Sequence, residues 1–214
     1  MSSSFSQKRQ SMVAKQLICR GISDKRVLEA MQKIPREEFV PNVHRDLAYE
    51  DAPLEIGFGQ TISQPYVVAR MCELLNLKGD EKVLDIGSGS GYQAAVLSKI
   101  ADQVFAVEVI PELVSSAKNV FSKLNYDNIT VVVKNGRLGL SEYAPFDAIK
   151  SAAASNGVPE IWFTQLKVGG RIVAPIGKSF HQNIVKYTKT ETGVHEEIFE
   201  GVRFVPLINT NKSL

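Results

Sequence analysis

The sequence predicts an α/β fold, in which a mostly parallel sheet is covered by helices on both faces and ends in an antiparallel pair. Between residues 82 and 174, short apolar segments alternate with amphipathic ones. This alternation is typical of parallel strands joined by crossover helices. Two segments, 184–190 and 194–199, flank a Glu191-Thr192-Gly193 turn, which predicts a hairpin. The chain has 214 residues, which fits one large domain.

The composition indicates a globular chain. Hydrophobic residues make up 44% and charged residues 22%, which excludes a disordered or fibrous protein. Uninterrupted apolar runs all stay short of the roughly 18 residues that a membrane span needs, so we expect no membrane partner. The net charge is +2, too small for the basic stripe of a nucleic-acid-binding protein, so we expect no nucleic-acid partner.

Cysteine and histidine usage argues against a metal site. The two cysteines, Cys19 and Cys72, form neither a CxxC pair nor a disulfide framework, and only three histidines are present. A chain of this kind is typical of a reducing compartment, and we therefore expect a cytoplasmic protein without bound metal.

The first helix is predicted over residues 11–20, ended by Gly21. Residues 1–23 contain no acidic side chain, as in a transit peptide. We prefer an amphipathic helix, because the pattern continues into the next element without a cleavage-like site.

A second helix is predicted over residues 24–33, with Ser23 as its N-cap. Residues 35–62 are expected to be a loop, because proline and glycine interrupt every run. The next helix is expected to begin near Pro65, since proline fits a first helical turn.

The core of the fold is predicted to begin at residue 82. Strands are expected over 82–86, 104–107, 129–133, 146–149 and 171–174. Helices are expected over 92–100, 111–124 and 159–166. A single domain, residues 1–214, is thus predicted to consist of an N-terminal helix and loop region (1–62), an α/β core (63–180) and a C-terminal hairpin and tail (181–214).

A glycine-rich turn is the clearest candidate site. The first core strand runs into Gly87-Ser88-Gly89-Ser90-Gly91, and a helix follows. Glycines allow a ligand to approach the backbone closely and allow positive φ. Glycines also serve ordinary tight turns, so the interpretation depends on residues elsewhere.

Two carboxylates support a nucleoside ligand. Glu108 ends the second core strand, 17 residues after Gly91, where a carboxylate accepts hydrogen bonds from both hydroxyls of a ribose. Asp85 lies inside an apolar strand, and a buried carboxylate needs a partner. We expect that partner to be a cationic amino group on the ligand.

The residues at and after the glycine-rich turn also indicate which kind of nucleotide-containing ligand the site can bind. Tyr92 occupies the position of the third glycine of a dinucleotide-binding fingerprint, and the chain has no GxxxxGK[ST] phosphate loop. The ligand therefore offers a ribose but has no conventional phosphate cradle. An adenosyl group with an amino-acid tail, S-adenosylmethionine, fits both conditions.

Several segments match a known family: 27–31, 35–41, 48–51, 59–65, 144–149, 165–167, 169–171 and 204–207. On these, the chain resembles the protein-L-isoaspartate O-methyltransferases from residue 12 to residue 207. The Thr-Ile-Ser segment at 61–63 and the Phe-Val-Pro-Leu segment at 204–207 are specific to that family. The glycine loop is common to all class I methyltransferases.

The resemblance implies a Rossmann-like, doubly wound sheet of seven strands with added N-terminal helices. It implies methyl transfer from S-adenosylmethionine to the free α-carboxylate of L-isoaspartyl residues, and of D-aspartyl ones, with S-adenosylhomocysteine as product. The ester then closes to a succinimide, which reopens as normal aspartate, so damaged proteins are repaired. The implied partners are isoaspartyl-containing peptides and proteins, and a monomer is expected.

The resemblance also assigns the site residues. Ser63 corresponds to the active-site serine, whose hydroxyl can orient the substrate carboxylate. That carboxylate is already ionised at neutral pH, so no general base is needed. Ser63 could also cap the helix near Pro65. The implied cofactor-binding residues are Gln60, Thr61, Ile62, Asp85, Gly87, Ser88, Gly89, Gly91, Glu108, Val109, Asn135 and Gly136.

Two lysines depart from the family pattern. Lys134-Asn135-Gly136 stands where the family has Gly-Asp-Gly, whose Asp contacts the adenine amino group. Lys150 stands where the family has an apolar residue, and a cation there is unfavourable near a sulfonium unless it is paired or reaches solvent. Two other functions stay open: a non-catalytic relative that acts as a protein-binding module, and a small-molecule or nucleic-acid methyltransferase. Base-directed methyltransferases usually carry [DN]-P-P-[YF] after this strand, which the chain lacks.

Overall fold

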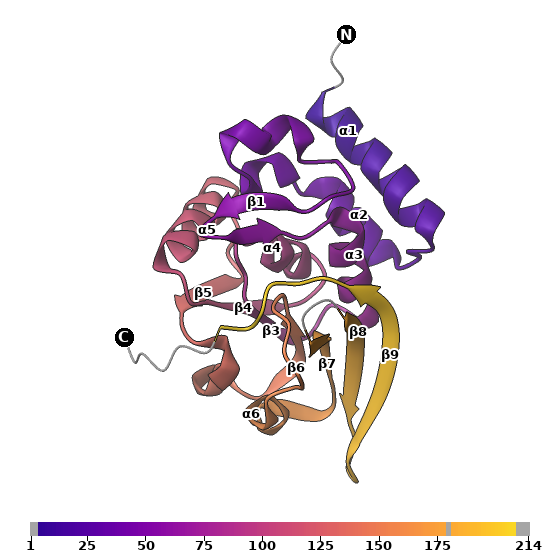
Figure 1. The fold of residues 1–214 in the computed structure, drawn as a ribbon, viewed down its shortest axis with the longest axis vertical. Coiled ribbons are helices and arrows are strands. Elements are labelled where there is room, and N and C mark those ends of the chain that lie inside the picture. The colour runs from indigo at the N-terminus through magenta and orange to yellow at the C-terminus, as the bar shows by residue number, and fades with distance from the viewer. Residues whose placement is uncertain (1–3, 179–180, 209–214) are drawn as a thin grey trace.

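The computed structural model describes residues 4–178 and 181–208, which form one seven-stranded sheet with helices around it (Figure 1). The strands are β3 (Lys82–Ile86), β4 (Gln103–Glu108), β5 (Ile129–Val133), β6 (Phe146–Ser151), β7 (Leu166–Lys178), β8 (His181–Lys189) and β9 (Val194–Val202). Their order is β5-β4-β3-β6-β7-β8-β9. Strands β3, β4, β5, β6 and β7 run parallel to one another, and β8 and β9 are each antiparallel to the strand before them, as predicted.

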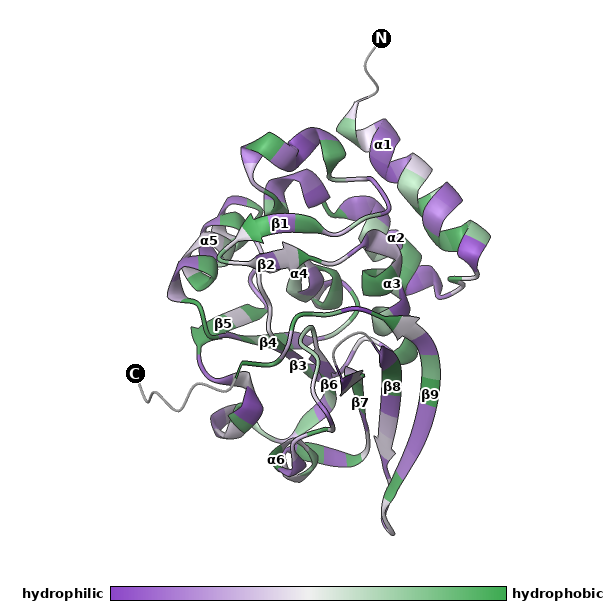
Figure 2. Ribbon diagram, in the orientation of Figure 1, coloured by the Kyte–Doolittle hydropathy of each residue, from purple (hydrophilic) through white to green (hydrophobic). Residues whose placement is uncertain are grey.

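Alternating side chains place two apolar layers on the sheet. Val83 packs in a cluster with residues of the N-terminal helices and of α3 (Pro65–Leu74), α4 (Tyr92–Ser98) and α5 (Pro111–Lys123). Its neighbour Leu84 packs on the opposite face with Trp162 of α6 (Glu160–Thr164). The sheet is therefore covered on both faces, and Figure 2 shows α3 as largely hydrophobic.

The first helix begins earlier than predicted. Helix α1 (Phe5–Met12) starts six residues earlier than expected, at a capping box: the Ser4 hydroxyl accepts from the Gln7 N–H, and the Gln7 side chain accepts from the Ser4 N–H. A π-helical turn (Val13–Leu17) and a 3-10 turn (Ile18–Arg20) continue it. The helical segment ends at Gly21, whose φ is 90°, as expected.

The cap of the second helix differs from the prediction. Helix α2 (Lys25–Lys33) is capped by Asp24, whose Oδ1 accepts from the Arg26 N–H at 2.8 Å. Ser23 instead donates its backbone N–H to Glu73 of α3 at 2.7 Å. A tertiary contact thus occupies the residue that was expected to cap the helix.

The segment expected to be a loop contains regular structure. It holds two 3-10 turns (Arg36–Phe39 and Asn42–Leu47) and a small hairpin formed by β1 (Leu54–Gly57) and β2 (Gln60–Ile62). The hairpin turn has positive φ at Gly57 (93°), Phe58 (54°) and Gly59 (68°). The prediction missed these strands because they are short and the glycines of the turn separate them.

After β9 the chain returns across the carboxyl ends of the central strands (Figure 1). The Ala154 N–H donates to the Val205 carbonyl at 2.8 Å, and the Leu207 N–H donates to the Ala154 carbonyl at 2.7 Å. This segment therefore lies beside the end of β6. Within residues 4–178 and 181–208, no helix is long and apolar enough to cross a membrane.

Candidate functional site

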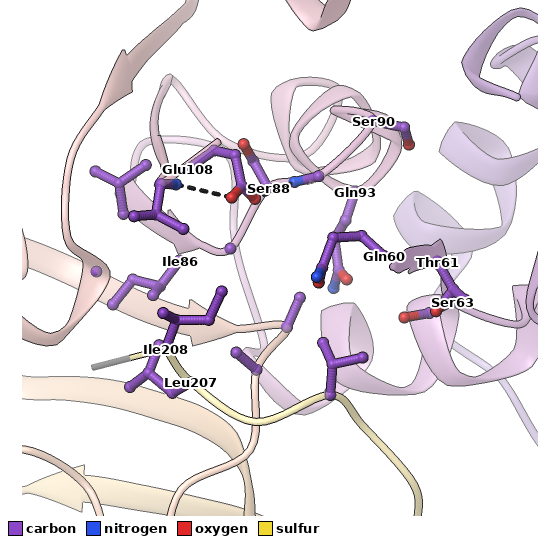
Figure 3. Close-up of a pocket in the computed structure, with 18 of the residues that line it drawn as sticks. Gln60, Thr61, Ser63, Ile86, Ser88, Ser90, Gln93, Glu108, Leu207 and Ile208 are labelled. Atoms are coloured by element: carbon purple, nitrogen blue, oxygen red, sulfur yellow. Dashed lines mark hydrogen bonds between the residues drawn. The ribbon is translucent and has the colours of Figure 1, made fainter. Parts of the chain in front are cut away.

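A cavity lies at the carboxyl ends of β3, β4 and β6, where parallel α/β sheets bind ligands. It encloses about 780 Å³ of atom-free space, part of it open to solvent. Four segments line it: the glycine loop, the β1–β2 hairpin, the turn after β5 and the returning segment after β9. Figure 3 shows Glu108 and Ser63 on opposite sides of this cavity.

The glycine loop turns sharply beneath the cavity. The N–H groups of Gly87 and Ser88 both donate to the Val107 carbonyl, at 2.8 and 3.1 Å. Gly91 adopts φ 84°, and a Cβ there would lie 2.5 Å from the Phe121 ring, so only glycine fits. The Ser88 hydroxyl lines the cavity, is buried and has no hydrogen-bond partner among the described residues. A buried unsatisfied hydroxyl at a cavity indicates a place for a polar ligand atom.

Glu108 is fixed by backbone groups. Its Oε2 accepts from the Gly89 N–H at 3.0 Å, and its Oε1 accepts from the N–H groups of Val109 and Ile110 at 2.7 and 3.1 Å (Figure 3). A carboxylate has about four lone-pair positions, so acceptor capacity is left for a ligand hydroxyl. Three N–H groups occupy three of about four positions, so this geometry leaves one acceptor position, which can bind a ribose hydroxyl.

Asp85 has a partner within the protein. Its Oδ1 lies 3.2 Å from Nζ of Lys150 on the neighbouring strand, and both side chains are 0% exposed. Asp85 does not line the cavity, whereas Lys150 does. Burial lowers the pKa of Lys150, and the charge of Asp85 opposes that shift. Lys150 therefore takes the place in which we expected an ammonium group of the ligand.

The turn after β5 carries the other unexpected lysine. Lys134 donates to both carboxylate oxygens of Glu142 at 2.7 Å, so its charge is balanced. The Asn135 side chain accepts from the Arg137 N–H at 3.0 Å and thus starts a 3-10 turn. Lys134, Asn135 and Gly136 all line the cavity.

Two side chains that the sequence analysis did not identify hold this turn. The Trp162 indole N–H donates to the Gly136 carbonyl at 3.0 Å. Gln165 donates to the Leu138 carbonyl at 2.9 Å and accepts from the Leu140 N–H at 2.7 Å. Helix α6 and its end thus determine where the turn lies, although they are far from it in sequence.

Ser63 lines the cavity but does not cap a helix. The N-cap of α3 is Gln64, and no side chain caps that end by a hydrogen bond, so the capping interpretation is wrong. The Ser63 carbonyl accepts from Nη2 of Arg36 at 2.7 Å. Arg36 is fully buried, donates through Nε to the Ala48 carbonyl at 2.7 Å, and lies 4.8 Å from the Tyr92 ring centroid. Sequence reasoning had no signal for this contact.

A second, larger cavity meets the first at Ser63. It encloses about 1,640 Å³ of atom-free space, part of it open to solvent, between α3 and the β8–β9 strands. Arg20 stacks on the Tyr66 ring at 3.6 Å on its wall, and Glu200 binds Arg70 at 3.0 Å. The two cavities share Thr61, Ser63, Ala152 and Val205. Ligands in the two cavities would meet at this junction.

Most of the predicted site residues come together. All of the predicted cofactor-binding residues except Asp85 and Gly91 line the first cavity. Of the lining residues Val205 to Ile208, the first three were matched to a family, but none of the four was predicted to form the site. No group of three or more His, Cys, Asp or Glu side chains suited to a metal ion occurs in the part of the chain that the structure describes.

Comparisons with known proteins agree with this site. Residues 7–212 match the family model of protein-L-isoaspartate(D-aspartate) O-methyltransferase. A protein-L-isoaspartate O-methyltransferase of Picosynechococcus sp. is 49% identical over 199 residues, which cover 93% of this chain and 89% of the relative. A protein-L-isoaspartate O-methyltransferase 2 of Marinobacter nauticus is 50% identical over 202 residues, covering 94% and 92%.

Solved structures give the same result. A protein-L-isoaspartate O-methyltransferase superposes with a TM-score of 0.84 at 32% identity, covering 94% of this chain and 66% of that one. A Plasmodium falciparum structure of the same description, in complex with S-adenosyl-L-homocysteine, has a TM-score of 0.79 at 27% identity. That match covers 94% of this chain and 98% of the other.

Proposed function

Because this chain belongs to the protein-L-isoaspartate(D-aspartate) O-methyltransferase family, we propose roles for its residues in that reaction. The chain is an S-adenosylmethionine-dependent protein carboxyl methyltransferase. It methylates the free α-carboxylate of L-isoaspartyl residues, which begins their repair. We propose that it also accepts D-aspartyl residues, in line with the description of the family.

The first cavity is the proposed cofactor site. The arrangement of Glu108 carries this proposal, because its carboxylate is held by three backbone N–H groups and still has acceptor capacity for a ribose. The unpartnered Ser88 hydroxyl offers a further polar contact. Asn135 and Gly136 would border the adenine, and Gln60, Thr61 and Ile62 would cover the cofactor from the hairpin side. When bound, the cofactor supplies a methyl group on a positively charged sulfur.

Ser63 is the proposed substrate-orienting residue. The substrate carboxylate is ionised at neutral pH and attacks the methyl carbon directly, so its oxygen needs only to be held in line and kept dry. Ser63 lies where the two cavities meet and can donate its hydroxyl to that carboxylate. Positioning of this kind supplies up to about 7–11 kcal/mol of barrier reduction in ideal cases.

The second cavity is the proposed peptide site. It is larger than the first and opens onto α3, β8 and β9. Its wall carries charges of both signs, including Arg20, Glu200 and Arg203. A peptide on this surface would present its isoaspartyl carboxylate to Ser63 at the junction.

The variant Ser63→Ala tests the role of Ser63. Loss of a hydrogen bond to a charged group should lower methyl transfer to an isoaspartyl peptide about 10- to 100-fold. The assay uses the matched aspartyl peptide as a blank, and Ser122→Ala, an exposed position on α5, is the control variant. Equal rates for Ser63→Ala and the unmodified enzyme would remove the proposed role, and equal labelling of both peptides would contradict the isoaspartyl specificity.

The assembly and the location of the enzyme are also proposals. We propose a monomer, which light scattering after gel filtration would detect as a mass near 23.6 kDa. The net charge of +2 supports the absence of a nucleic-acid partner, and the scarcity of cysteine supports a cytoplasmic location. We further propose that residues 1–214 form one methyltransferase domain, with the parts 1–62, 63–180 and 181–214, which predicts a single cooperative unfolding transition.

A further inference from the structure

A buried ion pair lies beneath the proposed cofactor site. Lys150 of β6 and Asp85 of β3 face each other in register on adjacent parallel strands. Their charged atoms are 3.2 Å apart, and neither side chain is exposed. The ammonium nitrogen has no other hydrogen-bond partner among the described residues. The pair thus places a lysine charge in the interior of the molecule.

The lysine end of this pair is the end that borders the cavity. Lys150 lines the first cavity, whereas Asp85 does not. Lys150 also precedes Ala152 by two residues, and Ala152 lines both cavities at their junction. The lysine therefore borders the same cavity as the junction residue Ala152.

The groups around the pair do not add a compensating charge. The neighbouring Cys72 thiol is fully buried, and burial raises its pKa to about 12, so it stays neutral. Gln93, which also lines the cavity, donates to the sulfur of Cys72 at 3.7 Å and is neutral. Lys150 is therefore the charged member of this group that lines the cavity, with Asp85 as its buried partner.

We propose that Lys150 is a specificity-determining residue that reduces the preference of the enzyme for its cationic cofactor over the neutral product. This inference rests on the proposed placement of the cofactor in the first cavity. S-adenosylmethionine carries a sulfonium, and S-adenosylhomocysteine is the same molecule without the methyl group and its positive charge. An ammonium near that sulfur repels only the first of the two. The enzyme should therefore retain its product more tightly, relative to its cofactor, than it would with an apolar residue at position 150.

The test measures the ratio of two dissociation constants on one protein. Calorimetric titrations give Kd for S-adenosylmethionine and for S-adenosylhomocysteine with the unmodified enzyme and with Lys150→Met. The proposal predicts that Lys150→Met changes the ratio in favour of S-adenosylmethionine by about fivefold or more, as expected for one charge in a medium of intermediate dielectric constant. Both ligands bind the same folded protein, so a general loss of structure changes both constants together and leaves the ratio unaltered.

Two further variants make the test decisive. Lys134→Met removes another lysine that lines the cavity and is paired with a carboxylate, but it lies in the turn after β5 and is 33% exposed, so the ratio should stay the same. Asp85→Asn with Lys150→Met removes both buried charges and is the variant to use if the single substitution prevents folding. It should also change the ratio in favour of S-adenosylmethionine. A ratio that is unaltered in both Lys150 variants, or equally altered by Lys134→Met, would overturn the proposal. If the unmodified enzyme bound neither ligand, the proposed cofactor site itself would be wrong.

Discussion

Arg36 is a buried cation with no carboxylate partner among the described residues. Its guanidinium instead holds two carbonyl groups, those of Ala48 and Ser63, and packs against Tyr92. Burial lowers the pKa of Arg36, which shows that its surroundings disfavour the charge. A cation kept in such a place fixes the backbone at Ser63 through its carbonyl group.

Removal of Arg36 should therefore affect catalysis as well as stability. We expect Arg36→Met to leave two carbonyl groups unsatisfied, at a cost of about 1–3 kcal/mol each in the free energy of unfolding. At a temperature where the variant is folded, kcat with an isoaspartyl peptide should fall about tenfold or more, because Ser63 is less firmly held.

The matched control is Arg171→Met. Arg171 also donates to two carbonyl groups, those of Leu75 and Asn76, at 2.6 and 2.9 Å, but it lines neither of the two site cavities. Urea unfolding should show a loss of stability in both variants, and steady-state kinetics should show a loss of kcat only in Arg36→Met. A kcat that falls equally in both would reduce Arg36 to a structural residue.

The parts of the candidate site that could be predicted are those whose residues lie close together in the sequence. The loop 87–91 and Glu108 follow from strand ends and spacing. The contacts of Arg36 with Ser63 and of Trp162 with Gly136 join residues 27 and 26 positions apart, and no local pattern contains them. Asp85 was correctly expected to need a cationic partner, but the partner lies on the neighbouring strand, and its identity depends on the register of the sheet.

Among the elements, the turn between α3 and β3 is built around one carboxylate. Both oxygens of Glu81 accept from the Lys78 N–H, at 2.8 and 2.9 Å, and Oε2 also accepts from the Gly79 N–H at 2.9 Å. Burial favours the protonated form of Glu81, but these N–H groups and Arg171 outweigh it and hold its pKa below the ordinary 4.5. The ionised form thus stabilises the connection between a helix and the sheet.

This turn gives a pH-dependent prediction. Since the folded pKa of Glu81 is depressed, its contribution is complete above the unfolded pKa of about 4.5 and is lost as the pH falls through the lower folded value. Glu81→Gln should therefore lower the free energy of unfolding by about 1–3 kcal/mol at pH 7, and the difference should shrink steadily below about pH 4.5.

Urea unfolding at several pH values measures this difference. Glu50→Gln, at an exposed position, is the control and should change stability by less than about 0.5 kcal/mol at every pH. A deficit of Glu81→Gln that persists unchanged at pH 3 would contradict an electrostatic origin.

Elements with long apolar patterns were predicted well, and short ones were not. Strands β3 and β5 have the predicted bounds, because each is an apolar run that ends at a turn signal. The β1–β2 hairpin was missed, because strands of four and three residues do not establish a period. Its position is nevertheless important, since it brings Gln60, Thr61 and Ile62 to the cavity.

At the scale of the whole molecule, a mostly parallel sheet with an antiparallel edge could be predicted, because apolar segments alternate with helical ones and a hairpin pattern follows them. The packing of the N-terminal helices against α3 and α4 could not be predicted, because it depends on which apolar faces of the helices meet. The two unexpected lysines illustrate the same limit. Each has a carboxylate partner, Lys134 in Glu142 and Lys150 in Asp85, and no local sequence pattern reveals either pair.

Ligand binding should stabilise the entire fold, since the proposed cofactor site joins segments from residue 60 to residue 208. S-adenosylhomocysteine at 100 times its Kd should raise the free energy of unfolding by about 2.7 kcal/mol, because it binds the folded state only. Urea unfolding with and without the ligand measures the change.

The comparison variant is Glu108→Gln, which keeps the shape of the side chain but removes the charged acceptor. At the same ligand concentration it should gain clearly less stability than the unmodified enzyme, since its affinity for the ribose is lower. An equal gain in both proteins would show that Glu108 does not contact the ligand.

The segment after β9 has a consequence for synthesis of the enzyme. Val205 to Ile208 form part of the cavity wall, yet the ribosome adds them after every strand and helix of the sheet. A nascent chain that has emerged only as far as residue 203 can pair all of its strands and still lack one wall of the catalytic chamber. Methylating activity should therefore begin only after the chain has been synthesised through residue 208.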